Sequence, residues 1–201
     1  MARPRTHDEA LRLRLLDRAG ELLSTEGPKA LSLRRLASDA GTSTTAVYSL
    51  FGSKPDLVNA LYTEGFQRFE SRMKSVGRGA DPIADLVGLG LAYRESALAD
   101  PHLYSIMFTK AVPGFEASPE ATELARRTLD PLLATVRAGI ESGTFSDVDP
   151  AVIAISAWGI VHGLVSLELN GNLPPGLDVG AAYERALRAH AEGWSAVDRG
   201  R

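Results

Sequence analysis

Between residues 34 and 54 the chain gathers side chains that donate hydrogen bonds to anionic oxygens and to base edges. Arginine and lysine pair with phosphates, and serine, threonine and tyrosine hydroxyls donate to the same oxygens or contact bases. The residues of this set are Arg34, Arg35, Ser43, Thr44, Thr45, Tyr48 and Lys54. No asparagine, glutamine or arginine lies between residues 42 and 51, so sequence recognition would rest on threonine methyl groups, water and DNA shape.

A helix-turn-helix is the element that would position these side chains. Ser32 can cap a first short helix, and Gly41 ends it because glycine adopts left-handed geometry without steric cost. Thr42 and Ser43 can cap a second helix, which would enter a DNA major groove. The apolar positions that repeat at helical spacing over the pair are Leu33, Leu36, Ala37, Ala40, Ala46, Val47, Leu50 and Phe51.

A longer helix and a basic arm precede this pair. An apolar stripe predicts a helix over about residues 7–25, which Gly27 and Pro28 end. Arg3 and Arg5 form a basic arm that either reaches DNA on binding or is a tail that aids solubility.

A helix predicted over about residues 54–76 follows the pair. Ser53 and Asp56 form a capping box at its start. Lys54 lies in the first turn, where the helix dipole disfavours a cation, so a compensating anion is expected there and a DNA phosphate is the obvious candidate.

Residues 40–57 resemble the signature of the tetracycline-repressor (TetR) family of one-component regulators. Tyr48, Phe51, Lys54 and Leu57 match that signature at the right spacing. Leu50 departs from it, since many relatives carry histidine there as a phosphate donor, and that contact is not carried over.

The resemblance implies a ligand-responsive transcription factor, most often a repressor. Such a regulator binds a pseudo-palindromic double-stranded operator as a homodimer, and a small-molecule effector releases it. The resemblance also implies that Lys54 contacts a DNA phosphate. Two alternatives stay open from the sequence: a DNA-binding activator or architectural protein without an effector, and a small helical enzyme or carrier with a vestigial head.

The rest of the chain predicts an all-α fold of about nine helices. Residues 1–53 form the expected DNA-binding domain, and residues 54–201 form the effector-binding and dimerisation domain. Pro131 predicts a kink or split in a helix over about 119–142. The further predicted helices cover about 82–99, 101–108, 150–169 and 179–196.

The segment 150–169 is apolar nearly all round, so it should be buried on more than one side. Gly159 and Gly163 would let another helix approach closely. We therefore expect a homodimer through the last two helices.

Trp158, His162 and Gly163 resemble the Trp-x-x-x-His-Gly element of one C-terminal subclass of these regulators, the WHG class. An effector site in this domain would be mostly apolar with a few polar groups. Each candidate side chain for the effector site could instead be an ordinary core residue. These candidates are Tyr93, Tyr104, Met107, Phe108, Trp158 and His162.

Composition and charge limit the kinds of function and cellular location that the chain can have. Residues 1–54 hold nine basic and six acidic residues, and the remainder holds 13 basic and 19 acidic, as expected for a phosphate-binding head on an acidic body. The chain has no cysteine, and its four histidines lack metal-ligand spacing, so no cofactor, metal site or enzyme chemistry is expected. The polar N-terminus is no signal peptide, and interrupted apolar runs predict no membrane span, hence a cytoplasmic location.

Overall fold

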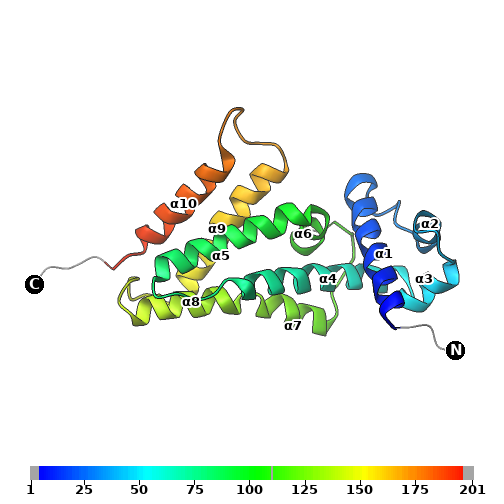
Figure 1. Ribbon diagram of the computed structural model, residues 1–201, viewed down its shortest axis with the longest axis horizontal. Coiled ribbons are helices and arrows are strands. Elements are labelled where there is room, and N and C mark those ends of the chain that lie inside the picture. Colours follow the sequence, from blue (N-terminus) through cyan, green and yellow to red (C-terminus); the bar gives the residue numbers. More distant parts are fainter. Residues whose placement is uncertain (1–4, 110, 197–201) are drawn as a thin grey trace, which may run out of the picture. The chain divides into compact units, whose positions relative to one another are not determined.

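The computed structural model describes the backbone of residues 5–109 and 111–196, with side chains from residue 8 onward (Figure 1). Within these ranges all regular secondary structure is α-helical, which confirms the predicted all-α fold. The helices are α1 (Arg5–Glu26), α2 (Leu33–Asp39), α3 (Thr44–Phe51), α4 (Lys54–Ser75), α5 (Pro82–Ala99), α6 (Pro101–Phe108), α7 (Pro119–Arg127), α8 (Asp130–Glu141), α9 (Pro150–Leu169) and α10 (Val179–Gly193). The side chains of Arg3 and Arg5 lie outside the described residues, and Arg5 begins α1.

The helix predicted over residues 119–142 is split in two. α7 ends at Arg127, and α8 begins at Asp130 with Pro131 in its first turn. Proline is tolerated there because the first turn needs no N–H donor, whereas deeper in a helix its ring clashes with the preceding turn. The described residues therefore hold ten helices, one more than the sequence predicted.

Helices α1, α2 and α3, called the head from here on, share one core. Leu36 of α2 and Val47 of α3 are fully buried in it. Gly41 makes the turn between these two helices with φ +61°, and Ser32 caps α2 by accepting from the backbone N of Arg35 at 3.2 Å. The predicted helix-turn-helix is confirmed in its turn and its caps.

Only Gly52 and Ser53 join α3 to α4. Gly52 has φ +71°, and the Ser53 hydroxyl donates to Asp56 Oδ2 at 2.6 Å while accepting from the backbone N of Asp56 at 3.3 Å. Phe51 before the joint and Leu57 after it are both buried in the same core. The end of α3 and the start of α4 are thus fixed to one packing unit.

The chain divides into two compact units. Unit 1 comprises residues 1–68 and 100–125, and unit 2 comprises residues 69–99 and 126–201. The packing therefore places the first part of α4, all of α6 and most of α7 with the head, because Leu61, Leu103 and Ile106 extend its core. The boundary predicted from the sequence, after residue 53, divides the DNA-binding from the effector-binding and dimerisation domain, and it stays a prediction.

An ion-pair network holds the helices of unit 1 together. Arg68 of α4 pairs with Asp17 of α1 at 2.9 Å, with Glu64 at 2.9 Å and with Asp100, which precedes α6, at 2.8 Å. Glu64 is buried and also meets Arg12 at 3.3 Å. Burial alone would lower the pKa of Arg68, but these three hydrogen-bonded carboxylates raise it above its ordinary value.

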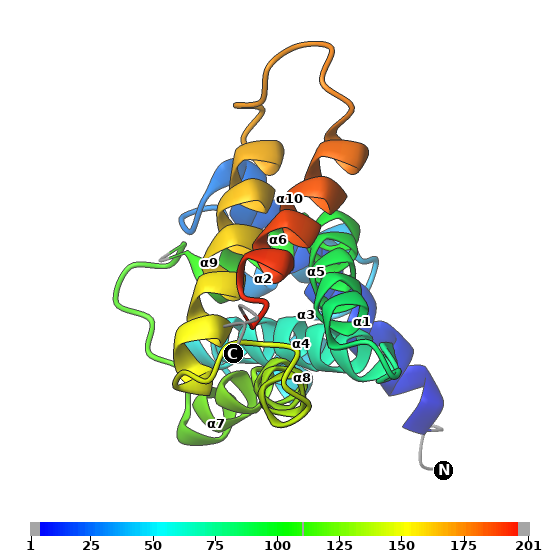
Figure 2. The ribbon, with the colours of Figure 1, turned by 90° about the vertical axis from the view of Figure 1, so that its left-hand side faces the viewer.

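Unit 2 is built around α5, which packs against α8, α9 and α10 (Figure 2). Arg94 of α5 makes a paired contact with Glu168 of α9, at 2.6 and 2.7 Å. Gly90 gives α10 room to approach, since a Cβ there would lie 2.6 Å from Leu187 Cδ1, and the Tyr183 hydroxyl donates to the Gly90 carbonyl at 3.0 Å.

One face of α9 is apolar and open to solvent. Val152, Ile155 and Leu167 are 46%, 59% and 42% exposed, and a Cβ at Gly159 or Gly163 would meet no atom within 4 Å. At 100° per residue these five positions form a single stripe along the helix. In one copy of the chain this face is uncovered, so the prediction that α9 is buried on more than one side stays a prediction that requires a second partner for the helix.

By length and composition α9 could also cross a membrane, and it is the one such helix among the described residues. The expectation that no segment is long and apolar enough is therefore wrong. The finding is weak support for a membrane segment, because an apolar helix that packs in a core or against a second helix passes the same test.

Candidate nucleic-acid interface and ligand cleft

The outward face of α3 consists of Thr45, Tyr48 and Ser49, all exposed. Tyr48 is 49% exposed, so it is not a core residue. Val47 and Phe51 lie on the opposite face and hold the helix to the head. Sequence reasoning missed Ser49, although its spacing of four residues from Thr45 places it on the same face.

The start of α3 is occupied by its own cap. Ser43 accepts a hydrogen bond from the backbone N of Ala46 at 3.1 Å, so its hydroxyl oxygen is already committed to the helix. Thr44, the first residue of α3, is half-buried. Thr44 is therefore less accessible than Thr45, whereas exposed Ser43 keeps its O–H donor free for another partner.

The two neighbouring arginines of α2 differ in what they can bind. Arg34 is exposed, and no ion pair joins it to another described residue. Arg35 makes a two-point contact with Glu26, at 2.8 and 2.6 Å, and lies 3.9 Å from Asp39. Its hydrogen bonds with Glu26 raise the pKa of Arg35 and lower that of Glu26. Arg34 is the better donor to an external anion.

Lys54 has a partner within the head. Its Nζ donates to the carbonyl oxygen of Pro28, in the turn after α1. This carbonyl supplies part of the negative partial charge that a cation in the first turn of α4 requires. An ammonium has three N–H donors, so Lys54 can still contact a phosphate.

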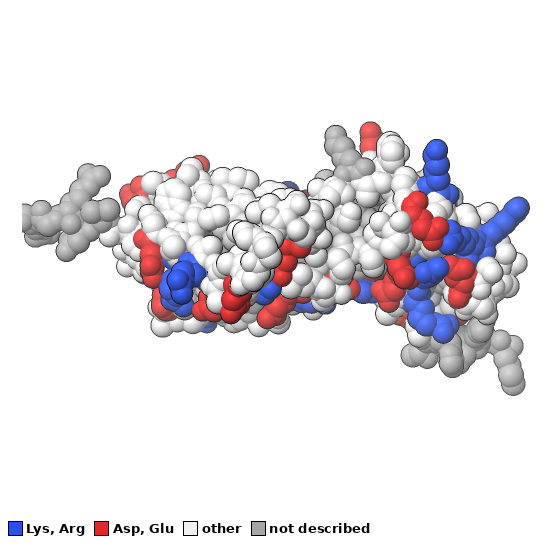
Figure 3. Space-filling model, turned by 90° about the horizontal axis from the view of Figure 1, so that it is seen from above, with Lys and Arg blue, Asp and Glu red and all other residues white. Residues whose placement is uncertain are grey.

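Figure 3 shows Lys and Arg interspersed with Asp and Glu on the head, and charged residues of both signs along one side of unit 2 as well. The cations of the head are thus partly neutralised by their neighbours, as Arg18 is by Glu21 and Asp39, at 2.7 and 2.8 Å. Exposed Lys29 and Arg14 add positive charge that the candidate set omits.

The six effector candidates fall into two groups that belong to different units. In unit 2 the Tyr93 hydroxyl lies 3.1 Å from His162 Nδ1, and the Trp158 ring is 6.3 Å from that of His162. Burial lowers the pKa of His162, which favours the neutral imidazole. His162 thus lies within hydrogen-bonding distance of a phenol.

In unit 1, Tyr104 and Phe108 belong to a chain of packed rings. The Phe108 ring lies 4.9 Å from Tyr104 and 5.7 Å from Phe66, and Tyr62 continues the chain 4.8 Å from Phe66. Met107 fills the space over Gly65, where a Cβ would lie 2.8 Å from its sulfur. Tyr104 is buried, whereas Met107 and Phe108 are only partly buried.

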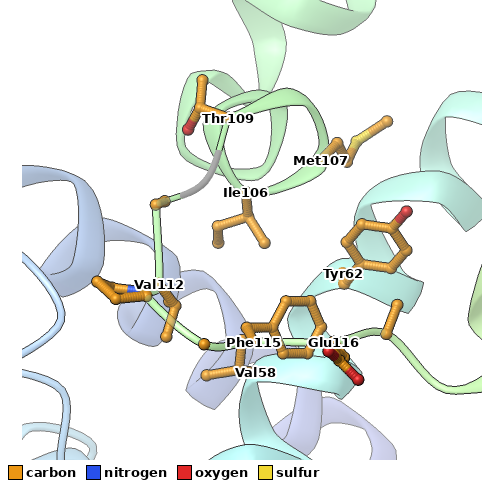
Figure 4. A pocket seen from close by; sticks show the side chains of 12 residues that line it. Val58, Tyr62, Ile106, Met107, Thr109, Val112, Phe115 and Glu116 are labelled. Atoms are coloured by element: carbon orange, nitrogen blue, oxygen red, sulfur yellow. The ribbon is translucent and has the colours of Figure 1, made fainter.

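A cleft of about 470 Å³ opens in unit 1 beside this ring chain. In Figure 4, Tyr62 and Val58 of α4, Ile106 and Met107 of α6, and the loop after α6 surround it. Of the six effector candidates only Met107 lines it. The full lining is Val58, Tyr62, Ile106, Met107, Thr109, Ala111, Val112, Pro113, Gly114, Phe115, Glu116 and Ala117.

The loop that walls this cleft is tied to α4. The backbone N of Ser118 donates to Asn59 Oδ1 at 2.9 Å, and the Phe115 ring packs 5.7 Å from that of Tyr62. A molecule between the loop and α4 would therefore contact both.

A second hollow, of about 510 Å³, lies in unit 2 and is lined by side chains of both charges, Lys74, Arg78 and Asp85 among them. No group of three or more metal-ligating side chains occurs in the part of the chain that the structure describes.

Two family models match the chain. One, described as "Bacterial regulatory proteins, tetR family", matches residues 15–61, which include α2 and α3. The other, described as "Tetracyclin repressor-like, C-terminal domain", matches residues 86–190. The second match alone covers more than half of the chain.

Two curated relatives come from Mycobacterium tuberculosis. One HTH-type transcriptional regulator is 25% identical over 142 residues, which is 67% of this chain and 59% of that relative. The chain thus spans less than two thirds of that relative's length. An uncharacterized HTH-type transcriptional regulator is 30% identical over 158 residues, which is 78% of this chain and 69% of that relative.

Solved structures share the fold. A Rhodococcus sp. RHA1 protein of unknown function matches with a TM-score of 0.79 at 29% identity, over 92% of this chain and 95% of that one. The TetR family transcriptional regulator PfmR from Thermus thermophilus matches with a TM-score of 0.70 over 92% of this chain and all of that one, at 23% identity. The second likeness is one of fold alone.

Proposed function

Because this chain belongs to the TetR family of transcriptional regulators, we propose that it is a homodimeric repressor that binds a pseudo-palindromic operator and is released by a small-molecule effector. The observation that carries DNA binding is the exposed outward face of α3, together with exposed Arg34 on α2, the helix that packs against it. Two such faces would enter successive major grooves about 34 Å apart. The regulator would act in the cytoplasm, with access to the chromosome.

Arg34 is proposed as a phosphate contact, and Arg35 as a structural residue of the head. Arg34→Ala should weaken binding to operator and to random DNA alike, and should reduce the slope of log K against log salt by about one phosphate's worth. Arg35→Ala is the matched control, because Glu26 already occupies its guanidinium. Fluorescence anisotropy titrations at several salt concentrations measure both slopes, and equal reductions would contradict the assignment.

The open apolar stripe of α9 supports the homodimer. A second copy would cover Val152, Ile155 and Leu167, and the glycines at 159 and 163 would let two α9 helices cross closely. The self-complementary patch of a two-fold dimer needs one such surface per copy. A helix packed this way would no longer expose this apolar area to water.

Ile155→Glu should convert the dimer to a monomer at micromolar concentration, because it would bury two carboxylates opposite each other in an apolar interface. Sedimentation velocity measures the change. Leu98→Glu is the control, since Leu98 is also exposed, at 40%, but belongs to α5 rather than to α9. An Ile155→Glu protein that remains dimeric would exclude this face as the interface.

The proposed effector site is the cleft of unit 1. Its volume lies within the range of small-molecule sites, about 300–1,000 Å³. Most of its lining residues are apolar, but polar atoms make up nearly half of the surface they present, so the effector should carry polar as well as apolar groups. Val58 and Tyr62 line it on the same helix whose first turn carries Lys54. To release DNA, the effector must bind the state with displaced heads more tightly than the DNA-bound state.

Sequencing of genomic fragments that the purified protein retains would test the function. A sharp peak at one pseudo-palindromic promoter site is expected, and a compound related to the neighbouring genes should then displace the protein from that site. A specific peak that no such compound affects would favour a DNA-binding activator or architectural protein without an effector. Absence of any retained DNA at low salt would overturn the proposal.

A further inference from the structure

The part of the head that faces a major groove has an unusual chemistry. α3, from Thr44 to Phe51, contains no Arg, Lys, Asn, Gln, Asp or Glu. Arginine and lysine are the side chains that select guanine, asparagine and glutamine select adenine, and carboxylates accept from cytosine. The helix therefore lacks every side chain that makes a two-point or charged contact with those three bases.

One further kind of direct contact remains available to it. A threonine methyl group can pack against the C5-methyl group of thymine, which no other base of DNA carries in the major groove. Hydroxyl groups alone select weakly, because they can donate to or accept from any base edge. An uncharged helix that selects a sequence by direct contact must therefore use its methyl groups.

Thr45 is the residue placed to do this. It lies in the middle of the exposed face, between positions 48 and 49 of the next turn. Thr44 is half-buried at the helix start, and Ser43 and Ser49 have no methyl group. The hydroxyl of exposed Tyr48 suits a phosphate, which would fix the register of the helix.

We propose that Thr45 selects thymine, by packing its methyl group against the C5-methyl of one thymine in each half of the operator. This inference rests on the proposed DNA-binding function and names the bases it recognises. Charged groups outside α3, such as Arg34, then supply affinity without sequence preference, and Thr45 supplies the choice of base.

The experiment removes that methyl group from the DNA alone. Operator duplexes are first selected from a random-sequence pool with the full-length protein. Each thymine of the selected site is then replaced by deoxyuridine, which lacks only the C5-methyl. At one position in each half-site, replacing thymine by deoxyuridine should weaken binding about fourfold. The reason is that burying one methyl carbon contributes roughly 0.8 kcal/mol.

Three variants identify the protein partner of that thymine. Thr45→Ser keeps the hydroxyl and loses the methyl, so it should bind the thymine and deoxyuridine operators equally. Thr45→Val keeps methyl groups and should retain the difference, and Ser49→Ala is the control on the same exposed face. Thermal melting verifies that each variant is folded.

The outcomes separate this inference from the function beneath it. A pool that yields no enriched duplex would count against DNA binding itself. An enriched operator whose affinity no deoxyuridine substitution alters would overturn the thymine contact while leaving the regulator intact. Full deoxyuridine sensitivity in Thr45→Ser would assign the contact to another side chain and overturn the role of Thr45.

Discussion

Gly139→Ala should lower the free energy of unfolding by about 3 kcal/mol, the upper range for overpacking a core. The added Cβ would lie 2.2 Å from Cδ2 and 2.4 Å from Cε2 of Phe145. That ring is only 1% exposed, and its residue is anchored to the same position, because the Phe145 backbone N donates to the Gly139 carbonyl at 2.9 Å. The ring cannot move aside without breaking this local packing. Urea denaturation followed by circular dichroism measures the loss.

Two comparisons make this result specific. Gly88→Ala on α5 places its Cβ 3.4 Å from Val76 Cγ1, close to an ordinary contact, so it should gain about 0.5–1 kcal/mol from helix propensity. In a Phe145→Leu background, Gly139→Ala should cost much less, because the clashing ring atoms are gone. Additive losses in the double variant would refute the assigned clash.

Arg68→Met should destabilise unit 1 by about 2 kcal/mol, because it leaves the buried carboxylate of Glu64 with Arg12, at 3.3 Å, in place of two guanidinium partners. Arg68 is 26% exposed at its side chain, so the loss should fall below that of a fully buried pair. Asp17 and Asp100 also lose their guanidinium contact. Thermal and urea unfolding should both report the decrease.

The variant Arg68→Met with Glu64→Gln separates charge from shape. A neutral amide in place of the buried carboxylate removes the charge that Arg12 alone compensates less well, so the double variant should recover part of the lost stability. If it is no more stable than Arg68→Met, then lost packing of the arginine side chain, rather than the weakened compensation of the Glu64 carboxylate, is the cause.

Local signals in the sequence predicted turns and helix ends well. Ser32 and Ser43 cap their helices, Gly41 turns the chain, and Pro131 divides a helix, because each acts through backbone groups within a few residues of itself. Helical spacing also separated Val47 from the exposed face of α3. These features need no knowledge of distant segments.

Long-range partners could not be read from the sequence. Arg34 and Arg35 are equivalent in sequence, and only the structure shows that Glu26 occupies Arg35. The carbonyl that meets Lys54 belongs to Pro28, 26 residues away. Which acceptor a lysine or arginine side chain meets depends on the tertiary structure around it, and the residue type alone does not specify that.

The ligand cleft shows the same limit for apolar residues. Periodicity identifies side chains that leave water, but an aromatic ring packed on other rings and one that faces a cavity have the same pattern. Tyr104 and Phe108 pack on each other, while Tyr62 and Phe115, which were not candidates, line the cleft. The size and position of the cavity decide between these roles.

The two-residue joint between α3 and α4 makes the second helix a lever for the first. With its 22 residues, α4 is a continuous rod about 33 Å long, at 1.5 Å per residue. A tilt of only about 5° displaces the far end of such a rod by about 3 Å, the full length of a hydrogen bond. Because Phe51 and Leu57 anchor both sides of the joint in one core, little of that tilt is absorbed there. Under the proposed DNA-binding function, we therefore expect α3 to move together with the first turns of α4 rather than independently of them.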